Sequence, residues 1–331
     1  MQVQFQVLRQ TTGDAPRWQT YSLEVEPGAT ILDCLNRLKW EQDGSLAFRK
    51  NCRNTICGSC SIRINGRAAL ACKESVGQEL TNGLVDPSQA VPTITLAPLG
   101  NLPVITDLVV NMQPFWEDLN RITPYVQPTA SALSEREFLQ SPQERDQLNQ
   151  TGNCILCGAC YSDCNGKTAN PHFVGPHALA KAQRLLGDSR DSQREHRLAD
   201  YSQGTEGVWG CTRCYWCNTV CPMAVAPMDQ IGQIKQQILQ RQTAQASRPV
   251  RHRKVLVDLV KAGGWVDERK FGLQVVGNYF RDLRGIASIL PLGLRMLSRG
   301  KFPLSFEPST GTSVVRHLIE QVQGATSPPR P

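Results

Sequence analysis

Hydrophobic and polar residues alternate with a two-residue period through much of the first hundred positions. This is the period of strands that bury one face, and it predicts strands over 3–9, 18–26 and 93–96. A tight hairpin is predicted between two shorter alternating segments, where Asn65-Gly66 supplies the turn. In that register Ile64 pairs with Arg67, and Cys72 comes to lie beside Cys60.

Residues 31–39 repeat their hydrophobic positions every three to four residues, which predicts a helix. Thr30 and Asp33 have the spacing of a capping box at its start. Cys34 shares the apolar face with Leu35, so we expect this thiol to pack in the core as a small hydrophobic side chain.

Beyond Thr106 the pattern becomes helical. Helices are predicted over 107–121, 135–150, 178–186, 193–201, 228–240, 254–261, 273–283, 286–297 and 313–322. The most apolar of these segments, 286–297, contains Pro291 and Arg295 and is shorter than the roughly 20 residues that cross a bilayer. We therefore expect no transmembrane helix.

Thirteen cysteines set this chain apart from an ordinary globular protein of 331 residues with 40% hydrophobic residues. The N-terminal residues lack the basic start and apolar run of a secretory signal peptide, which indicates a reducing compartment. In such a compartment cysteines usually bind metals or carry out redox chemistry, and disulfides are rare.

Twelve of the cysteines form three groups of four. The groups are Cys52, Cys57, Cys60 and Cys72; Cys154, Cys157, Cys160 and Cys164; and Cys211, Cys214, Cys217 and Cys221. The first has the spacing of plant-type [2Fe–2S] proteins, and the others have the bacterial run in which the fourth cysteine reaches a second cluster. Zinc is the alternative, but one ion needs only four ligands from two cysteine pairs.

These patterns predict an α+β protein. We expect a β-grasp [2Fe–2S] ferredoxin-like domain over 1–105, an α-helical domain with two cubane-type clusters over 106–230 and a helical C-terminal extension over 231–331.

The net charge of +7 is unevenly distributed. Residues 231–331 contain 16 Lys and Arg against 6 Asp and Glu, whereas residues 1–230 contain 20 against 23. A basic amphipathic tail suits an anionic membrane surface, an acidic partner protein or a solvated face. Three anionic clusters would also add about −6, so part of the basicity can offset them. No nucleic-acid-binding motif accompanies the charge, and we predict no nucleic-acid partner.

Several segments resemble the iron–sulfur subunit of succinate dehydrogenase and fumarate reductase. They are the motif Phe-Arg-Lys-Asn-Cys-Arg-Asn-Thr-Ile-Cys-Gly-Ser-Cys at 48–60, the turn at 64–67, Leu-Ala-Cys at 70–72 and Pro-Leu-Gly-Asn-Leu-Pro-Val-Ile-Thr-Asp-Leu-Val-Val at 98–110. The resemblance covers residues 1–225 approximately. It implies that electrons pass from a flavin in a separate subunit through three clusters to a membrane quinone site.

The resemblance also implies the cluster ligands. It assigns the [2Fe–2S] cluster to Cys52, Cys57, Cys60 and Cys72, a central [4Fe–4S] cluster to Cys154, Cys157, Cys160 and Cys221, and a third cluster to Cys164, Cys211 and Cys217. Most relatives have a [3Fe–4S] third cluster because they lack a cysteine at the position of Cys214. We predict that Cys214 makes the third cluster [4Fe–4S] here, with [3Fe–4S] as the alternative.

The residues that the resemblance places near the quinone differ from the usual family pattern. Asn165 and Thr212 replace the Pro and His that help to form the quinone pocket in many relatives, which puts that pocket in doubt. Residues 292–304 look like C-terminal segments of heterodisulfide-reductase-type iron–sulfur subunits. With Cys214, this likeness suggests the less common class whose membrane partner is a cysteine-rich peripheral subunit.

The predicted function is electron transfer in a succinate:quinone oxidoreductase, EC 1.3.5.1, with no catalytic residues in this chain. The expected partners are a FAD-containing catalytic subunit and either a membrane anchor or a cysteine-rich peripheral subunit, with quinone reached indirectly. The expected location is peripheral, on the cytoplasmic side of a membrane. The alternatives are a fumarate reductase with a quinol or thiol donor and a stand-alone polyferredoxin.

Overall fold

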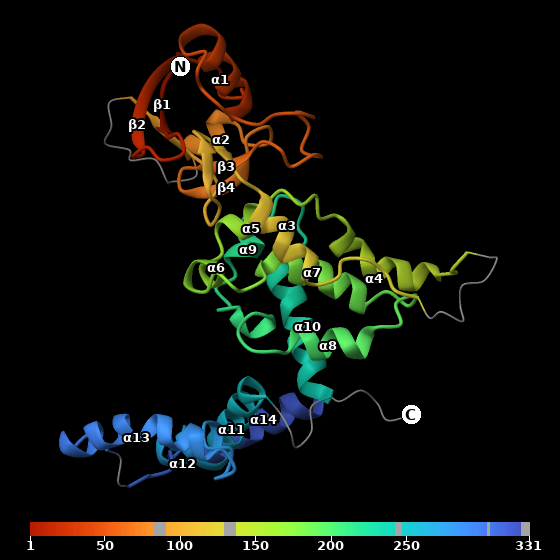
Figure 1. The fold of residues 1–331 in the computed structure, drawn as a ribbon, viewed down its shortest axis with the longest axis vertical. Coiled ribbons are helices and arrows are strands. Elements are labelled where there is room, and N and C mark those ends of the chain that lie inside the picture. Colours follow the sequence, from red (N-terminus) through yellow and green to blue (C-terminus); the bar gives the residue numbers. More distant parts are fainter. Residues whose placement is uncertain (82–90, 129–136, 242–246, 303–304, 326–331) are drawn as a thin grey trace. The chain divides into compact units, whose positions relative to one another are not determined.

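The computed structural model describes residues 1–81, 91–128, 137–241, 247–302 and 305–325. The chain forms two compact units, Met1–Ile238 and Leu239–Pro331, and each is described by itself (Figure 1).

The first unit begins with a mixed five-stranded sheet, as the alternating pattern predicts. Its strands are β1 (Gln2–Arg9), β2 (Arg17–Glu24), β3 (Ser61–Ile64), β4 (Arg67–Leu70) and β5 (Thr93–Ala97), in the order β2-β1-β5-β3-β4. β1 runs antiparallel to β2 and parallel to β5. Inward-facing residues such as Phe5, Ile64 and Leu96 are fully buried in the core.

Two helices accompany this sheet (Figure 1). α1 (Ile31–Arg37) begins with the expected capping box between Thr30 and Asp33, and it continues as one turn of π-helix, Leu38–Gln42. α2 (Val76–Thr81) follows the hairpin. Cys34 is buried within the core, as predicted, and burial raises the pKa of its thiol to about 12.

The β3–β4 hairpin has the predicted register. Ile64 pairs with Arg67, and both Asn65 and Gly66 have the positive φ that a type I′ turn needs. At the open end the N–H of Ala71 donates to the carbonyl of Cys60 at 3.1 Å. The turn therefore fixes the chain that carries Cys60 and Cys72.

The predicted helix over 107–121 is wrong in its first half. Two short strands, β6 (Val104–Thr106) and β7 (Val109–Val110), precede α3 (Gln113–Asn120). Asp107 has a φ of 50°, and its buried carboxylate accepts hydrogen bonds from the Arg9 side chain at 2.8 Å and the Ala47 N–H at 2.9 Å. These distant partners hold the segment in a turn, so the helix starts only at Gln113.

Helices make up most of the remaining first unit. They are α4 (Pro142–Gly152), α5 (Ala159–Ser162), α6 (Asn165–Ala169), α7 (Gly175–Leu186), α8 (Arg194–Tyr201), α9 (Trp216–Thr219) and most of α10 (Pro227–Arg241). α4 starts later than the predicted residue 135, which lies outside the described residues, because Ser141 caps it together with Glu144. α7 is almost wholly buried along its inner face.

The C-terminal unit contains α11 (Arg248–Gly263), α12 (Glu268–Val275), α13 (Leu283–Ser298) and α14 (Thr312–Ala325). The predicted helix over 273–283 is wrong, because α12 ends at Val275 and Asn278, Tyr279 and Phe280 all have positive φ. Within the described residues no helix is long and apolar enough to cross a membrane.

Candidate metal centres

The N-terminal cysteine loop, residues 51–59, has an irregular backbone. Arg53, Thr55 and Gly58 adopt positive φ values of 61°, 68° and 71°, so the chain repeatedly reverses its curvature. Alternating right- and left-handed residues turn successive N–H groups to one side, which makes a concave site for an anion.

These N–H groups converge on cysteine sulfur. The amides of Asn54, Ile56 and Cys57 donate to Cys52 Sγ at 3.5, 3.4 and 3.3 Å. They lower the pKa of the Cys52 thiol to about 6. The thiolate is the form that binds a metal, so the loop favours the form that iron requires.

The other three cysteines of this group lie close to Cys52. The Thr55 N–H donates to Cys72 Sγ at 3.3 Å, and the Ser59 hydroxyl donates to Cys57 Sγ at 3.1 Å. Burial raises the pKa of Cys60 to about 12, and nearby charge on Cys72 and Cys57 also raises it. The hairpin and the loop thus bring the first group together.

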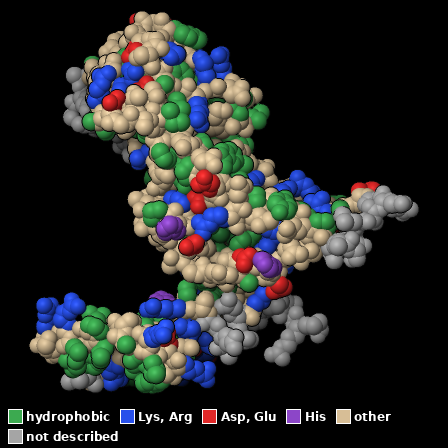
Figure 2. Space-filling view, in the orientation of Figure 1, with side chains coloured by type: hydrophobic (Ala, Val, Ile, Leu, Met, Phe, Trp, Pro, Cys, Tyr) green, Lys and Arg blue, Asp and Glu red, His purple; other side chains and the backbone are tan. Residues whose placement is uncertain are grey.

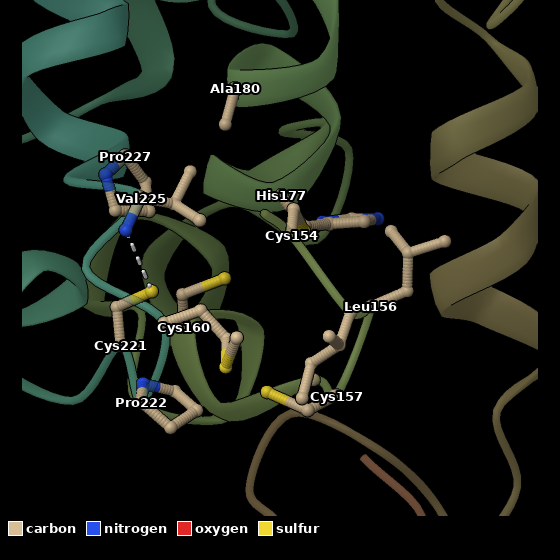
Figure 3. A pocket seen from close by; sticks show the side chains of 13 residues that line it. Cys154, Leu156, Cys157, Cys160, His177, Ala180, Cys221, Pro222, Val225 and Pro227 are labelled. Atoms are coloured by element: carbon tan, nitrogen blue, oxygen red, sulfur yellow. Dashed lines mark hydrogen bonds between the residues drawn. The ribbon is translucent and has the colours of Figure 1, made fainter. Parts of the chain in front are cut away.

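A second group is drawn from distant parts of the chain. Cys154, Cys157, Cys160 and Cys221 line one cavity, and Figure 3 shows their sulfur atoms facing a common space. Leu156 and Gly158 have positive φ and curve the cysteine loop before α5. On the opposite wall the Val225 N–H donates to Cys221 Sγ at 3.4 Å (Figure 3).

The cavity is a low-dielectric environment for charged sulfur. Burial raises the pKa of Cys157 and raises that of Cys160 well above its usual value. Neighbouring cysteine charges raise both further, including those of Cys154 and Cys221. Four thiolates alone would repel one another here, whereas a cationic iron–sulfur core would hold them together.

The remaining four cysteines also lie close together. Burial raises the pKa of Cys164, and charge on Cys211 and Cys214 raises it further. Burial likewise raises the pKa of Cys217 to about 12, with added repulsion from Cys211, Cys164 and Cys214. Cys214 is exposed and lies between Arg213 and Tyr215, which both have positive φ.

The three groups are linked in series. Gly58 of the first loop touches the second group, since a Cβ on Gly58 would lie 2.8 Å from Cys157 Cα. Charge on Cys217 of the third group raises the pKa of Cys160 in the second. The second group therefore lies close to each of the other two.

A buried carboxylate links the segments that carry the three cysteine groups. Asp163, between Cys160 and Cys164 in sequence, accepts hydrogen bonds from the Ala68 N–H at 2.7 Å and from Trp216 Nε1 at 3.3 Å. It thereby ties the β3–β4 hairpin to α5 and α9.

Two lysines, one partly buried and one buried, extend to the backbone of the segments that carry the cysteines. Lys181 Nζ donates to the carbonyl of Cys154 at 3.4 Å, and Lys235 Nζ donates to that of Cys211 at 3.3 Å. Burial lowers the pKa of each lysine, whereas the adjacent cysteine charge raises it. Sequence reasoning missed both, because nothing near them in the sequence marks them as neighbours of cysteines.

The donor set fits iron–sulfur clusters. Soft thiolates in groups of four, with N–H groups directed at sulfur, are the ligands and outer contacts that such clusters use. Among the described residues, no three His, Cys, Asp or Glu side chains converge closely enough to hold a single metal ion.

Comparisons with known proteins agree with this chemistry. Residues 4–117 match the family described as "2Fe-2S iron-sulfur cluster binding domain", and residues 150–225 match the "4Fe-4S dicluster domain". The chain is thus an iron–sulfur protein of ferredoxin type.

Its relatives define the family further. The chain is 35% identical over 222 residues to the mitochondrial succinate dehydrogenase [ubiquinone] iron-sulfur subunit 3 of Arabidopsis thaliana, covering 66% of this chain and 69% of that protein. It is 34% identical over 221 residues to the fumarate reductase iron-sulfur subunit of Escherichia coli, covering 67% and 86%. The chain belongs to the family of succinate dehydrogenase and fumarate reductase iron–sulfur subunits, as its motifs predict.

Two further comparisons extend this result. The iron-sulfur subunit of the 8-methylmenaquinol:fumarate reductase of Wolinella succinogenes is 29% identical over 262 residues, covering 78% of this chain and 80% of that one. A chain of the Mycobacterium smegmatis Sdh1 complex has the same fold, with a TM-score of 0.63 at 24% identity, covering 73% of this chain and 97% of that chain.

Proposed function

We propose that this chain is the electron-transfer subunit of a succinate:quinone oxidoreductase, EC 1.3.5.1. The observation that carries the proposal is the serial arrangement of three groups of four cysteines within one compact unit. The proposed ligands are Cys52, Cys57, Cys60 and Cys72 for a [2Fe–2S] cluster; Cys154, Cys157, Cys160 and Cys221 for a [4Fe–4S] cluster; and Cys164, Cys211, Cys214 and Cys217 for the third cluster.

When bound, these clusters supply one-electron redox chemistry, and the chain supplies their positions and surroundings. The direct approach of Gly58 to Cys157 keeps the first two groups close. Asp163 fixes the hairpin against the helices that carry the second and third groups. Cys217 is buried, which limits the access of water to this part of the path.

The third cluster is proposed to be [4Fe–4S]. Charge on Cys214 raises the pKa of both Cys164 and Cys217, which supports a position for its thiol beside theirs. Its exposure leaves the thiol free to turn toward a bound cluster. A fourth thiolate at this position would retain the fourth iron.

The proposed partners lie at the two ends of the series. A FAD-containing catalytic subunit would deliver electrons near the N-terminal loop, where Arg49 and Arg53 are exposed. A membrane anchor or a cysteine-rich peripheral subunit would receive them near Cys214, Tyr215 and Trp216, which are all exposed. We propose a peripheral location for the chain, on the cytoplasmic side of a membrane.

The reverse direction, fumarate reduction, is the second candidate because relatives from Escherichia coli and Wolinella succinogenes are named fumarate reductase subunits. Cluster potentials decide the direction. Potentiometric titration would support fumarate reduction if all three midpoint potentials lie below that of the succinate/fumarate couple.

The proposed function is tested with protein purified without oxygen together with its flavin subunit. We expect about ten iron atoms per chain, the content of one two-iron and two four-iron clusters. Added succinate should reduce the clusters, as followed by EPR. A folded, iron-loaded complex that succinate leaves oxidised would contradict the proposal, and a carrier that never binds a flavoprotein would favour the polyferredoxin alternative.

A further inference from the structure

α13 exposes a continuous apolar stripe. Leu283, Leu290, Leu294 and Leu297 expose 73%, 58%, 58% and 52% of their surfaces. Their spacing of seven, four and three residues places them on one face of the helix. No residue of α13 is buried, so this face has no covering within the described chain.

The stripe is separate from the surface by which α13 packs on its own unit. That packing surface contains Ile286 and Ile289, which lie against Gly277 and Gly272. A Cβ on Gly277 would lie only 2.7 Å from Ile286 Cγ1, which shows how closely this side is packed. The leucines therefore do not take part in the packing of α13 on its own unit.

Positive charge lies to one side of the stripe. By the 3.6-residue period, Arg284 and Arg295 lie about a third of a turn around α13 from the leucines, and Arg299 comes directly after the helix. The whole unit, Leu239–Pro331, contains 15 Lys and Arg against 6 Asp and Glu. Figure 2 shows hydrophobic side chains beside Lys and Arg on the visible face of this unit.

Aromatic residues stand at one end of the helix. Tyr279 and Phe280, just before α13, expose 52% and 67% of their surfaces. Aromatic side chains are enriched where a membrane's apolar layer meets its headgroups. An amphipathic helix with basic residues beside an apolar face lies in this interfacial layer.

We propose that α13 binds the surface of an anionic lipid bilayer. The leucine stripe enters the boundary of the acyl chains, and Arg284, Arg295 and Arg299 meet the lipid phosphates. A bilayer suits the feature better than an acidic protein because it offers apolar contact along the whole helix together with negative charge beside it. This inference does not depend on the proposed electron-transfer function.

The test uses the full-length holoprotein in a vesicle flotation assay. The vesicles contain phosphatidylcholine alone or about one third phosphatidylglycerol, because juxtamembrane basic residues favour anionic surfaces. We expect binding to the anionic vesicles at least about tenfold stronger than to neutral ones, and weaker binding at high salt.

Paired variants separate the stripe from the rest of the helix. Leu290→Ser with Leu294→Ser should weaken binding by about tenfold or more, since each loses buried apolar area in the bilayer. Leu292→Ser is the matched control, because Leu292 is 56% exposed on the other side of α13. Arg284→Gln with Arg295→Gln should reduce both binding and its salt dependence.

Three outcomes would overturn the proposal. In the first, the wild-type protein does not float with the vesicles. In the second, the double leucine variant floats as well as the wild-type protein. In the third, the leucines are required only when another subunit is bound. The last would identify the stripe as a protein interface. Vesicle binding needs neither succinate nor a flavin subunit, so its result is independent of the test of the proposed function.

Discussion

The N-terminal cysteine loop and the two helical cysteine groups stabilise negative sulfur in different ways. In the loop, three backbone amides donate to Cys52 and the Ser59 hydroxyl donates to Cys57. In the helical part, burial opposes the charged form of Cys160 and Cys217, and Lys181 and Lys235 bring positive charge to the cysteine segments. The loop stabilises thiolate charge mainly through N–H and O–H dipoles, whereas near the other two groups the lysine charges offset part of the cost of burying it.

The largest expected effect comes from removing Cys214. Cys214→Ser should convert the third cluster to a three-iron form, lowering the iron content from about ten to about nine per chain. Iron analysis and EPR of the oxidised protein measure this change. Cys34→Ala is the control, because Cys34 is a buried residue of the sheet core that is not among the proposed ligands. An unchanged iron content in Cys214→Ser would remove Cys214 from the ligand set.

Gly58→Ala should disrupt the contact between the first two groups. The new Cβ would lie 2.8 Å from Cys157 Cα, at a φ of 71° that disfavours alanine. We expect a loss of about 3 kcal/mol in stability from overlap and backbone strain together. Thermal unfolding of the holoprotein measures it.

Gly66→Ala provides the matched control for this change. Gly66 has a φ of 83°, but nothing lies within 4 Å of a Cβ there. It should therefore lose only about 1 kcal/mol from backbone strain. Equal losses in the two variants would show that the Gly58–Cys157 contact contributes nothing.

Lys181→Met should make the central cluster harder to reduce. A positive charge near Cys154 favours the more negative, reduced state, so its removal should lower the midpoint potential by about 60 mV, or tenfold in the reduction equilibrium. Potentiometric EPR titration measures this shift. Lys270→Met, at a mostly exposed side chain of the C-terminal unit, should leave the potential unchanged. A shift of all three clusters would point to a general structural effect.

Ser59→Ala should have the smallest effect of the four. The variant loses one hydroxyl donor to Cys57 Sγ, worth about 1 kcal/mol, which corresponds to about 40 mV. The [2Fe–2S] potential should fall by this amount while the other two stay constant. Ser22→Ala, on the exposed face of β2, is the control. If Ser59→Ala leaves the potential unchanged, the amides alone set the electrostatics of the loop.

Local signals predicted the parts of the molecule that neighbouring residues determine. The Asn65-Gly66 turn gave the hairpin register, and Thr30 with Asp33 marked the start of α1. Cysteine spacing predicted the domain types that the family comparisons confirm. In each case the interacting residues lie close together in the sequence.

Distant contacts explain what the sequence did not predict. Asp107 sits in a helix-like pattern, yet Arg9 and Ala47 hold it in a turn. The approach of Gly58 to Cys157 and of Lys181 to Cys154 likewise depends on tertiary packing. Hydrophobic periodicity contains no information about such pairs, because they are formed by residues from separate parts of the chain.

The cavity around the second cysteine group has a consequence for biogenesis. Three of its cysteines lie on one side of α7 and α8 in the sequence, and Cys221 lies on the other. During synthesis the ribosome must therefore release the chain beyond Cys221 before this cavity can close, whereas the cysteines of the N-terminal loop and hairpin emerge much earlier. Cofactor insertion can begin at the amino end while the rest of the polypeptide is still being translated.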